Sequence, residues 1–375
     1  MSSNQLRVMH FVAGGFTGST SVAIDLVRST ANNPQISSFL VLRKRPTTDL
    51  ARFNKLIDEQ LPVTMISSRF KLITILQLYR LCKKFQPDVL VAHGYTEHLW
   101  GRYAGLLAKV PHLVHVEHNS RENYSRWRLF QAHWLSKYTD AIIGCAQGVK
   151  VQLEKLKFPA EKISVIPNGI ELDRFSAADH SPFETRVPGI VMPARFGKQK
   201  DHLTLVRAIA LLRDKGIQVP VTFAGMGHNR YFKAAQAMTQ ELNLSGQITF
   251  AGHCSNLPEL LISHQLCVLS TNWEGMPIAL TEGMAAGCAV IGTAVPGVQE
   301  MIQHDQDGLL VPPKSPYEMA EAIEKLLQNT DFAKRIANNA RARAVQEFSL
   351  ITMRERYEEV YYSLVNRKTT NNYQS

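Results

Sequence analysis

The chain has 375 residues, 45% hydrophobic and 20% charged, which is the balance of a soluble globular protein of about two domains. Its five cysteines are scattered and contain no C-x-x-C pair, which argues against a zinc site and for a reducing compartment. No apolar run approaches the roughly 20 residues of a membrane span, and we expect no signal peptide because the N-terminus lacks a long apolar region.

The net charge of +10 is distributed unevenly along the chain. Residues 1–182 contain 23 Lys and Arg against 14 Asp and Glu, whereas residues 183–375 contain 19 against 18. Aromatic residues such as Phe70, Tyr79 and Trp127 are interleaved with the basic ones. The N-terminal half therefore has the charge of a surface that binds a polyanion, and an anionic membrane fits it.

The first half alternates apolar runs with helical patterns, as a parallel α/β sheet does. Strands are predicted at 6–12, 38–42, 63–66, 88–92, 113–117 and 141–146. Gly14 and Gly15 lie in the glycine-rich loop after the first strand, where backbone can approach a phosphate or a sugar closely. His93 and His118 follow two later strands, at the edge where parallel sheets bind ligands.

The segment 176–188, which holds Pro182 and Pro188, is predicted to be the linker between two domains. The expected domains are therefore 1–182 and 183–350. A last helix is predicted at about 351–366.

In the second half, strands are predicted at 189–193, at 221–227 with a glycine turn at its end, and at 248–253, 266–270 and 288–292. Arg195 and Lys200 flank the loop between the first of these strands and the next helix. Two cations in such a loop can neutralise a pyrophosphate leaving group.

The stretch 272–287 carries the most specific signal of the chain. Glu274 lies on a loop at the carboxyl end of a strand, Pro277 fits the first position of a helix, and Glu282 lies five residues further along that helix. Amide groups at the helix N-terminus offer an anion site between the two carboxylates. A nucleotide sugar needs groups in the same order, for its sugar hydroxyls, its pyrophosphate and its ribose.

This stretch resembles the paired-glutamate motif of the family 4 retaining glycosyltransferases, and the resemblance covers nearly the whole chain. It implies the GT-B architecture: α/β, with two doubly wound Rossmann-like parallel-sheet domains facing across a cleft, an acceptor-binding domain first and a donor-binding domain second, with the last helix returning to the first domain. Met276, where an aromatic is common, and Gly283, where alanine is usual, depart from the family pattern.

The resemblance also implies roles for individual residues. Glu274 would contact the donor sugar and Glu282 the ribose, and His118 would lie close to the transferred sugar. The remaining donor-binding positions would be Arg195 and Lys200 at the diphosphate, Gly275, Met276 and Pro277 beside Glu274, Gly225 and His253 at the base, and Gly15 near the phosphates. His93 and Gly14 would lie on the acceptor side.

The expected function is a retaining, metal-independent glycosyltransferase that uses no cofactor. It would move a hexose or N-acetylhexosamine from a nucleotide sugar, by default a UDP-sugar, to a lipid-linked glycan in bacterial polysaccharide synthesis. Asp305-Gln306-Asp307 is formally a D-x-D metal motif, but its place before Gly308 indicates a turn. We expect a cytoplasmic enzyme, peripheral on the inner face of the membrane, with no nucleic acid as partner.

Two alternatives remain open from the sequence. One is a sugar-nucleotide epimerase on the same architecture, which would turn over its donor without an acceptor. The other is a non-enzymatic basic adaptor, which would bind no nucleoside diphosphate.

Overall fold

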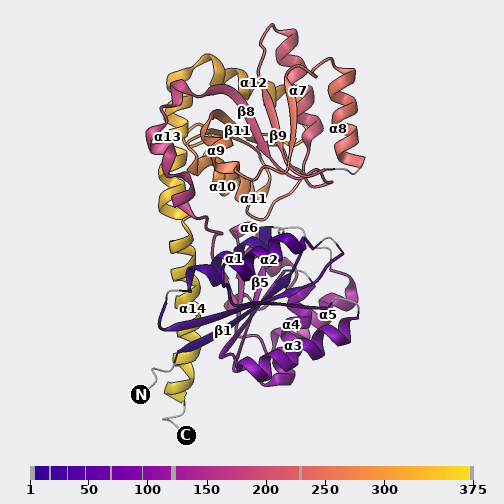
Figure 1. Cartoon of the computed structure of the whole chain (residues 1–375), viewed down its shortest axis with the longest axis vertical. Helices are drawn as coiled ribbons and strands as arrows, with labels where there is room; N and C mark the ends of the chain where they lie inside the picture. The colour runs from indigo at the N-terminus through magenta and orange to yellow at the C-terminus, as the bar shows by residue number, and fades with distance from the viewer. Residues whose placement is uncertain are drawn as a thin grey trace. The chain divides into compact units, whose positions relative to one another are not determined.

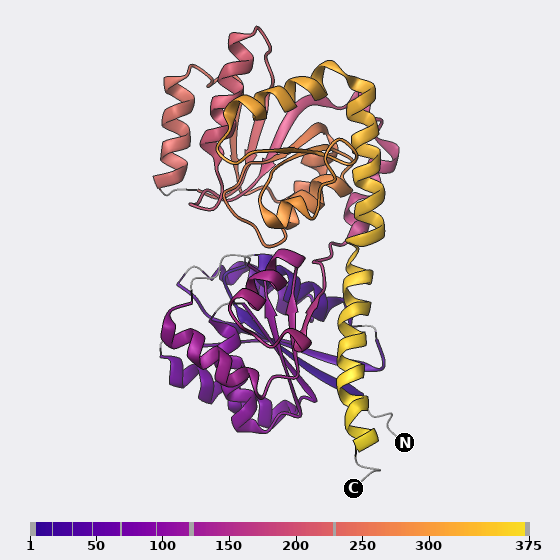
Figure 2. The same ribbon diagram turned by 180° about the vertical axis from the view of Figure 1, so that it is seen from behind.

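The computed structural model describes residues 5–16, 18–31, 33–46, 48–67, 70–94, 96–119, 124–227 and 230–371. The chain forms two compact units, unit 1 (Met1–Gly169 with Leu350–Ser375) and unit 2 (Ile170–Ser349). Each unit is a parallel sheet with helices on its faces, seen from opposite sides in Figures 1 and 2. The prediction of two doubly wound parallel-sheet domains is confirmed.

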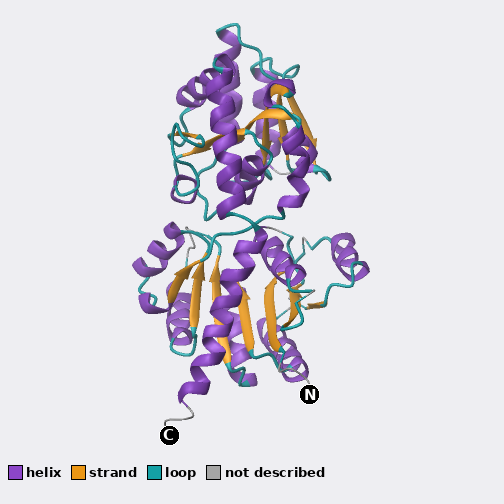
Figure 3. Ribbon diagram, turned by 90° about the vertical axis from the view of Figure 1, so that its left-hand side faces the viewer, coloured by secondary structure: helices purple, strands orange, loops and turns teal. Residues whose placement is uncertain are grey.

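The strands of unit 1 are β1 (Leu6–Ala13), β2 (Ile36–Arg43), β3 (Val63–Ile66), β4 (Val89–His93), β5 (His112–Glu117), β6 (Ala141–Gly144) and β7 (Ile163–Val165). Its helices are α1 (Gly18–Ser29), α2 (Leu50–Asp58), α3 (Lys71–Phe85), α4 (Glu97–Ala108), α5 (Arg126–Ser136), α6 (Gln147–Lys155) and α14 (Leu350–Asn371). The strand order is β3-β2-β1-β4-β5-β6-β7, so the direction of winding reverses between β1 and β4. Figure 3 shows the strands of each unit in orange and the helices that flank them in purple.

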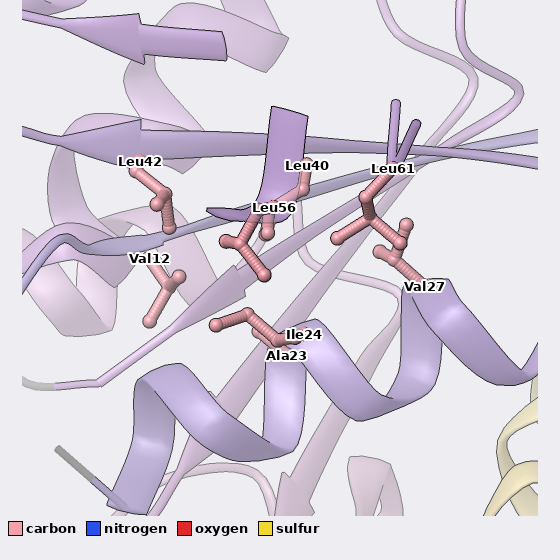
Figure 4. Close-up of a cluster of buried hydrophobic side chains, with 8 residues drawn as sticks. All are labelled: Val12, Ala23, Ile24, Val27, Leu40, Leu42, Leu56 and Leu61. Atoms are coloured by element: carbon pink, nitrogen blue, oxygen red, sulfur yellow. The ribbon is translucent and has the colours of Figure 1, made fainter. Parts of the chain in front are cut away.

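The strands read as near-continuous apolar runs because helices cover both faces of the sheet. Between the sheet and helices α1 and α2 lies a buried cluster of eight side chains (Figure 4): Val12, Ala23, Ile24, Val27, Leu40, Leu42, Leu56 and Leu61. The three members from α1 lie on one helix face, at the spacing that a 3.6-residue period requires. This packing fixes the end of β1, and with it the glycine-rich loop that follows.

Helix α14 belongs to unit 1 although it ends the chain. It packs beside α1, and the Asn33 side-chain amide donates to the Glu358 carboxylate at 3.2 Å. The backbone N–H of Gly169 lies 3.1 Å from the Met353 sulfur at the start of α14. The last helix thus belongs to the first domain, as the family resemblance implies.

The strands of unit 2 are β8 (Val187–Pro193), β9 (Val221–Ala224), β10 (Ile248–Gly252), β11 (His264–Leu269), β12 (Ala289–Thr293) and β13 (Leu309–Val311). Its helices are α7 (His202–Asp214), α8 (Arg230–Glu241), α9 (Leu257–Ile262), α10 (Ile278–Ala285), α11 (Pro296–Gln299), α12 (Pro316–Gln328) and α13 (Thr330–Glu347). The order β10-β9-β8-β11-β12-β13 places the reversal of winding between β8 and β11.

The boundary between the units differs from the predicted one. Residues 170–182 belong to unit 2, and the predicted linker 176–188 contains 3₁₀ turns and the start of β8. Phe175 and Phe183 are buried there, and the Arg186 guanidinium donates to the carbonyls of Ala286 and Gly287 at the end of α10. The two prolines therefore lie in a packed segment, which composition alone does not distinguish from a linker.

Candidate active site

Two loops lie side by side at the carboxyl ends of β8 and β11, where the winding of unit 2 reverses. The Asp201 N–H donates to the Ser270 carbonyl at 3.0 Å, and the Asn272 N–H donates to the Gln199 carbonyl at 2.8 Å. Lys200 and Thr271 form an antiparallel bridge between them. Open α/β sheets bind their ligands at such a switch point. The loop with Arg195 and Lys200 and the loop with Glu274 thus form one local structure.

Glu274 is buried at this point, with only 5% of its surface exposed. Its carboxylate accepts hydrogen bonds from Lys200 Nζ at 2.5 Å, Thr271 Oγ1 at 2.8 Å and Gln199 Nε2 at 3.0 Å. A buried carboxylate is stable only when it is paired and hydrogen-bonded, and donors from both loops meet that need. The carboxylate is therefore held in one orientation before any ligand binds.

Lys200 and Glu274 form an ion pair, although the sequence analysis assigns Lys200 to the diphosphate and Glu274 to the donor sugar. The Lys200 side chain is 11% exposed, so the pair is shielded from water on both sides. Arg195 is exposed at the start of the same loop. Arg195 is thus the more accessible of the two cations, while Lys200 also fixes the carboxylate.

Helix α10 begins at Ile278, one residue later than predicted, and Pro277 occupies the N-cap position. Proline has no side chain that could cap the helix, so the amides of the first turn remain available to an anion. Gly275 and Met276 are buried just before it, and Glu282 is half-buried one turn into the helix. The expected order of carboxylate, amides and second carboxylate is present along the backbone.

Two glycines of this region are required by packing. A Cβ on Gly283 would lie 2.5 Å from the Cys267 sulfur, which explains why the family's usual alanine is absent here. A Cβ on Gly225 would lie 2.0 Å from the Ala194 carbonyl oxygen, so this glycine lets β9 pass the end of β8. His253 is exposed just beyond β10, two strands away from β8 in the sheet.

Gly297 belongs to the same local structure, although the sequence gives it no specific role. It lies in α11, and a Cβ there would come within 1.8 Å of the Gly275 carbonyl oxygen and 2.8 Å of that of Glu274. Only glycine lets α11 pack directly against the backbone that carries Glu274. The Pro296-Gly297-Val298 run was the available signal, but the contact is not visible in the sequence.

In unit 1, three histidines form a hydrogen-bonded row across the switch point. His10 Nδ1 lies 3.0 Å from His93 Nε2, and His93 Nδ1 lies 3.2 Å from His118 Nε2. Burial lowers the pKa of His10 to about 3 and that of His118 to about 4, and it lowers the pKa of His93 well below its usual range. All three rings are therefore neutral at pH 7, and each carries a single N–H.

A neutral ring with both nitrogens engaged must donate through one and accept through the other. The tautomer of His118 is thus coupled through His93 to His10. His93 is fully buried, and both of its nitrogens are engaged within this row, which leaves neither of them for the expected acceptor-side contact. The His118 Nδ1 atom is buried and has no hydrogen-bond partner among the described residues.

The glycine-rich loop after β1 is explained in part by packing. The Gly14 N–H donates to the Arg43 carbonyl at 2.8 Å, and a Cβ on Gly14 would lie 3.0 Å from that oxygen. Gly14 is buried by this contact, while Gly15 beside it is half-buried. Of the two glycines, Gly15 is the more accessible to a ligand.

The D-x-D sequence lies in a turn of unit 2. The Asp305 carboxylate pairs with Lys325 at 2.7 Å, and the Asp307 carboxylate pairs with Arg343 at 2.9 Å. Asp307 also accepts from the Gln303 N–H at 2.6 Å. Within the described ranges, no group of three or more His, Cys, Asp or Glu is arranged to hold a metal ion.

Two family models match the chain in succession. The model for glycosyltransferase family 4 matches residues 18–174, and the model for glycosyl transferases group 1 matches residues 174–343. The second range contains both loops of the unit 2 switch point.

Several curated proteins match at low identity over most of their length. The UDP-Gal:alpha-D-GlcNAc-diphosphoundecaprenol alpha-1,3-galactosyltransferase of Escherichia coli is 25% identical over 79% of this chain and 80% of its own. The lipopolysaccharide core biosynthesis glycosyltransferase LpsE of Rhizobium meliloti is 24% identical over 97% of this chain and 100% of its own.

Solved structures share the fold. The crystal structure of Anabaena Alr3699/HepE in complex with UDP and glucose superposes with a TM-score of 0.83 at 20% identity, covering 96% of this chain and 100% of that one. The chain belongs to the group 1, family 4 glycosyltransferases, and it is a glycosyltransferase with the GT-B fold.

Proposed function

We propose that this enzyme transfers a hexose or N-acetylhexosamine from a UDP-sugar to a lipid-linked glycan during the synthesis of a bacterial surface polysaccharide, with retention of configuration and without a metal ion. The observation that carries the proposal is the Glu274 carboxylate, fixed by Lys200, Gln199 and Thr271 at the unit 2 switch point. The name of the E. coli relative specifies both a UDP-sugar donor and a diphosphoundecaprenol acceptor.

The donor would use the groups that the two loops present. Arg195 and the first-turn amides of α10 would bind the diphosphate, together with Lys200, and Glu282 would bind the ribose. Gly275, Met276 and Pro277 would shape the loop under the sugar. Gly225 and His253 would contact the base, and Gly15 would lie near the phosphates. Preorganised positive charge at a developing leaving group is among the largest contributions that an enzyme makes.

Glu274 would hold the sugar, and His118 is the residue of unit 1 that we propose to contact it. The bond from the anomeric carbon to the diphosphate breaks, and the acceptor oxygen bonds to that carbon from the same face. The acceptor proton passes to a phosphate oxygen of the departing UDP. This route needs no base with a shifted pKa, so positioning and charge stabilisation supply most of the rate.

The test is a transfer assay with a panel of nucleotide sugars and a lipid-linked glycan as acceptor, read by mass spectrometry. We expect a UDP-sugar to give an acceptor-dependent product whose anomeric configuration, measured by NMR, matches the donor. The rate should be unchanged by EDTA, because Arg195, Lys200 and the helix amides carry the charge stabilisation.

Two results would contradict the proposal. Donor turnover without an acceptor, giving an altered sugar and free UDP, would support the epimerase instead. Loss of activity in EDTA that Mg²⁺ or Mn²⁺ restores would overturn the metal-independent mechanism.

A further inference from the structure

Helices α3, α4 and α5 lie together on one face of the unit 1 sheet, with α4 between the other two (Figure 1). Large apolar side chains of α3 and α5 point into solvent instead of into the core. On the α3 side these are Phe70, Leu72, Ile73 and Leu76, and on α5 they are Trp127, Phe130 and Trp134. Leu72 is 80% exposed, Trp127 67% and Phe130 60%. We call these seven residues the apolar rim.

The rim follows from the helical period of α5. Trp127, Phe130 and Trp134 recur at the spacing of a single helix face, while Ala132 and Leu135 on the opposite face are buried. The Trp127 and Phe130 rings stack at 5.5 Å, and Trp134 stacks on Tyr103 of α4 at 6.0 Å. The exposed face of α5 is therefore an ordered aromatic surface, and clustered exposed apolar side chains mark interaction sites.

The position of the rim follows from the topology. A crossover helix begins where its strand ends, so the first turns of α3 and α5 lie at the carboxyl edge of the sheet. His93 ends β4 and His118 directly follows β5 at that same edge. Lys71 at the start of α3 lies over the Trp100 ring of α4 at 5.4 Å, which joins the first turns of neighbouring helices. Phe70, Leu72, Ile73 and Trp127 of the rim thus lie at the edge of unit 1 that carries its candidate site residues, and the rim continues along α5 to Trp134 in the last turn of that helix.

The charged side chains of helices α3 and α5 are all basic. Neither α3 nor α5 contains a carboxylate, and their first turns carry Lys71, Arg126 and Arg128. Cations at a helix N-terminus oppose the helix dipole by roughly 0.3–1 kcal/mol each, so helix stability does not explain them. An anionic surface held against these first turns would remove that repulsion.

The structure also separates this basic set from others in the N-terminal half. Arg43 and Arg45 pair with the buried Glu97 at 2.5 and 2.6 Å, so their charges serve the fold. Lys83 and Lys84 lie in the last turn of α3, at the opposite edge of the sheet. Only Lys71, Arg126 and Arg128 of the basic residues on α3 and α5 lie in the first turns.

We propose that the apolar rim, with Lys71, Arg126 and Arg128, inserts into an anionic phospholipid membrane. Tryptophan and phenylalanine at a basic helix face are the side chains that hold a protein at a bilayer interface. A second copy of the chain is a poorer occupant of this surface. Its own unit 1 has a net charge of +12 (26 Lys and Arg, 14 Asp and Glu) and would repel Lys71, Arg126 and Arg128, and its unit 2 has a net charge of only −2 (16 and 18), which is too small to balance them. None of the described helices is both long and apolar enough to span a bilayer.

This proposal rests on the proposed lipid-linked acceptor, since docking at the carboxyl edge of unit 1 would bring that acceptor to the enzyme. It is tested by co-sedimentation of the full chain with vesicles of phosphatidylcholine alone or mixed with phosphatidylglycerol, over a range of salt. Binding should require phosphatidylglycerol and weaken as salt screens the charges. The double substitution Trp127→Ser with Phe130→Ser should weaken binding about tenfold through lost apolar insertion.

The matched control uses the two ends of α3 and α5. Arg126→Glu with Arg128→Glu should weaken binding about tenfold or more, whereas Lys83→Glu with Lys84→Glu makes the same change of charge at the other edge and should retain most of it. Equal losses in both would show that only net charge matters and would overturn the proposal. So would full binding by the Trp127 and Phe130 variant, or a dimer in solution that this variant dissociates.

UDP binding, measured by calorimetry, separates this inference from the proposed function. The rim variants should bind UDP as the unaltered chain does, because the donor loops belong to unit 2. A chain that binds vesicles as described but transfers no sugar would leave the membrane surface standing and remove the lipid-linked acceptor. A chain that transfers sugar but shows no vesicle binding would overturn the rim alone.

Discussion

Replacing Lys200 by methionine should lower the free energy of unfolding of unit 2 by about 3 kcal/mol and abolish transfer, because it leaves a buried carboxylate without its countercharge. Thr271 and Gln199 would still donate to Glu274, which keeps the loss at the lower end of the range for a broken buried pair. Urea unfolding and the rate of sugar transfer measure the two effects.

Lys198→Met is the matched control, because it makes the same change on the same loop at an exposed side chain. It should leave stability and rate near those of the unaltered chain. Lys200→Met combined with Glu274→Gln removes both charges, so it should recover most of the stability and none of the activity. Activity in the double variant would mean that the ion pair serves the fold alone.

Replacing Gly297 by alanine should lower the rate of transfer about 100-fold, because a shift of about 1 Å at a reacting group has an effect of that size. The added Cβ would lie 1.8 Å from the Gly275 carbonyl oxygen, so either α11 or the Glu274 loop has to move. Overpacking of this kind also costs about 1–3 kcal/mol of stability. Transfer kinetics and thermal unfolding of the purified variant measure both.

Gly246→Ala provides the comparison, since a Cβ there meets nothing within 4 Å and the residue is exposed. It should behave as the unaltered chain. A Gly297→Ala enzyme with normal kinetics would show that the backbone of Glu274 is not held by α11.

Much of the fold could be predicted because local patterns decide it. Buried parallel strands are short apolar runs, so the positions of β1 to β6 and of β8 to β12 were predicted to within a few residues. Arg195, Lys200, Glu274 and Glu282 could be selected because they flank strand ends and a helix start, which is where ligand chemistry concentrates in such sheets. The motif that contains Glu274 then indicated the family that the two family models confirm.

Contacts between distant segments could not be predicted. The Lys200–Glu274 pair joins residues 74 positions apart, and the sequence assigned each a separate task. His10 lies within β1 and shows its place in the histidine row only when β1 and β4 are neighbours. Gly297 looks like any turn glycine until α11 is packed on the Glu274 loop. The domain boundary was wrong because a packed 3₁₀ segment has the composition of a linker.

In the basic half of the chain, too, the sequence did not reveal which residues are in contact. Its charge could be counted, but the sequence does not tell which cations face a partner. The structure assigns Arg43 and Arg45 to Glu97 and separates the two ends of α3. Only that division allows a charge-matched control for membrane binding.

Hydrogen exchange of the full chain, with and without saturating UDP, reports directly whether a nucleoside diphosphate binds at the switch point of unit 2. We expect slower amide exchange in residues 194–201 and 271–283, with no change in α8. Protection confined to unit 1, or no protection at saturating UDP, would contradict it.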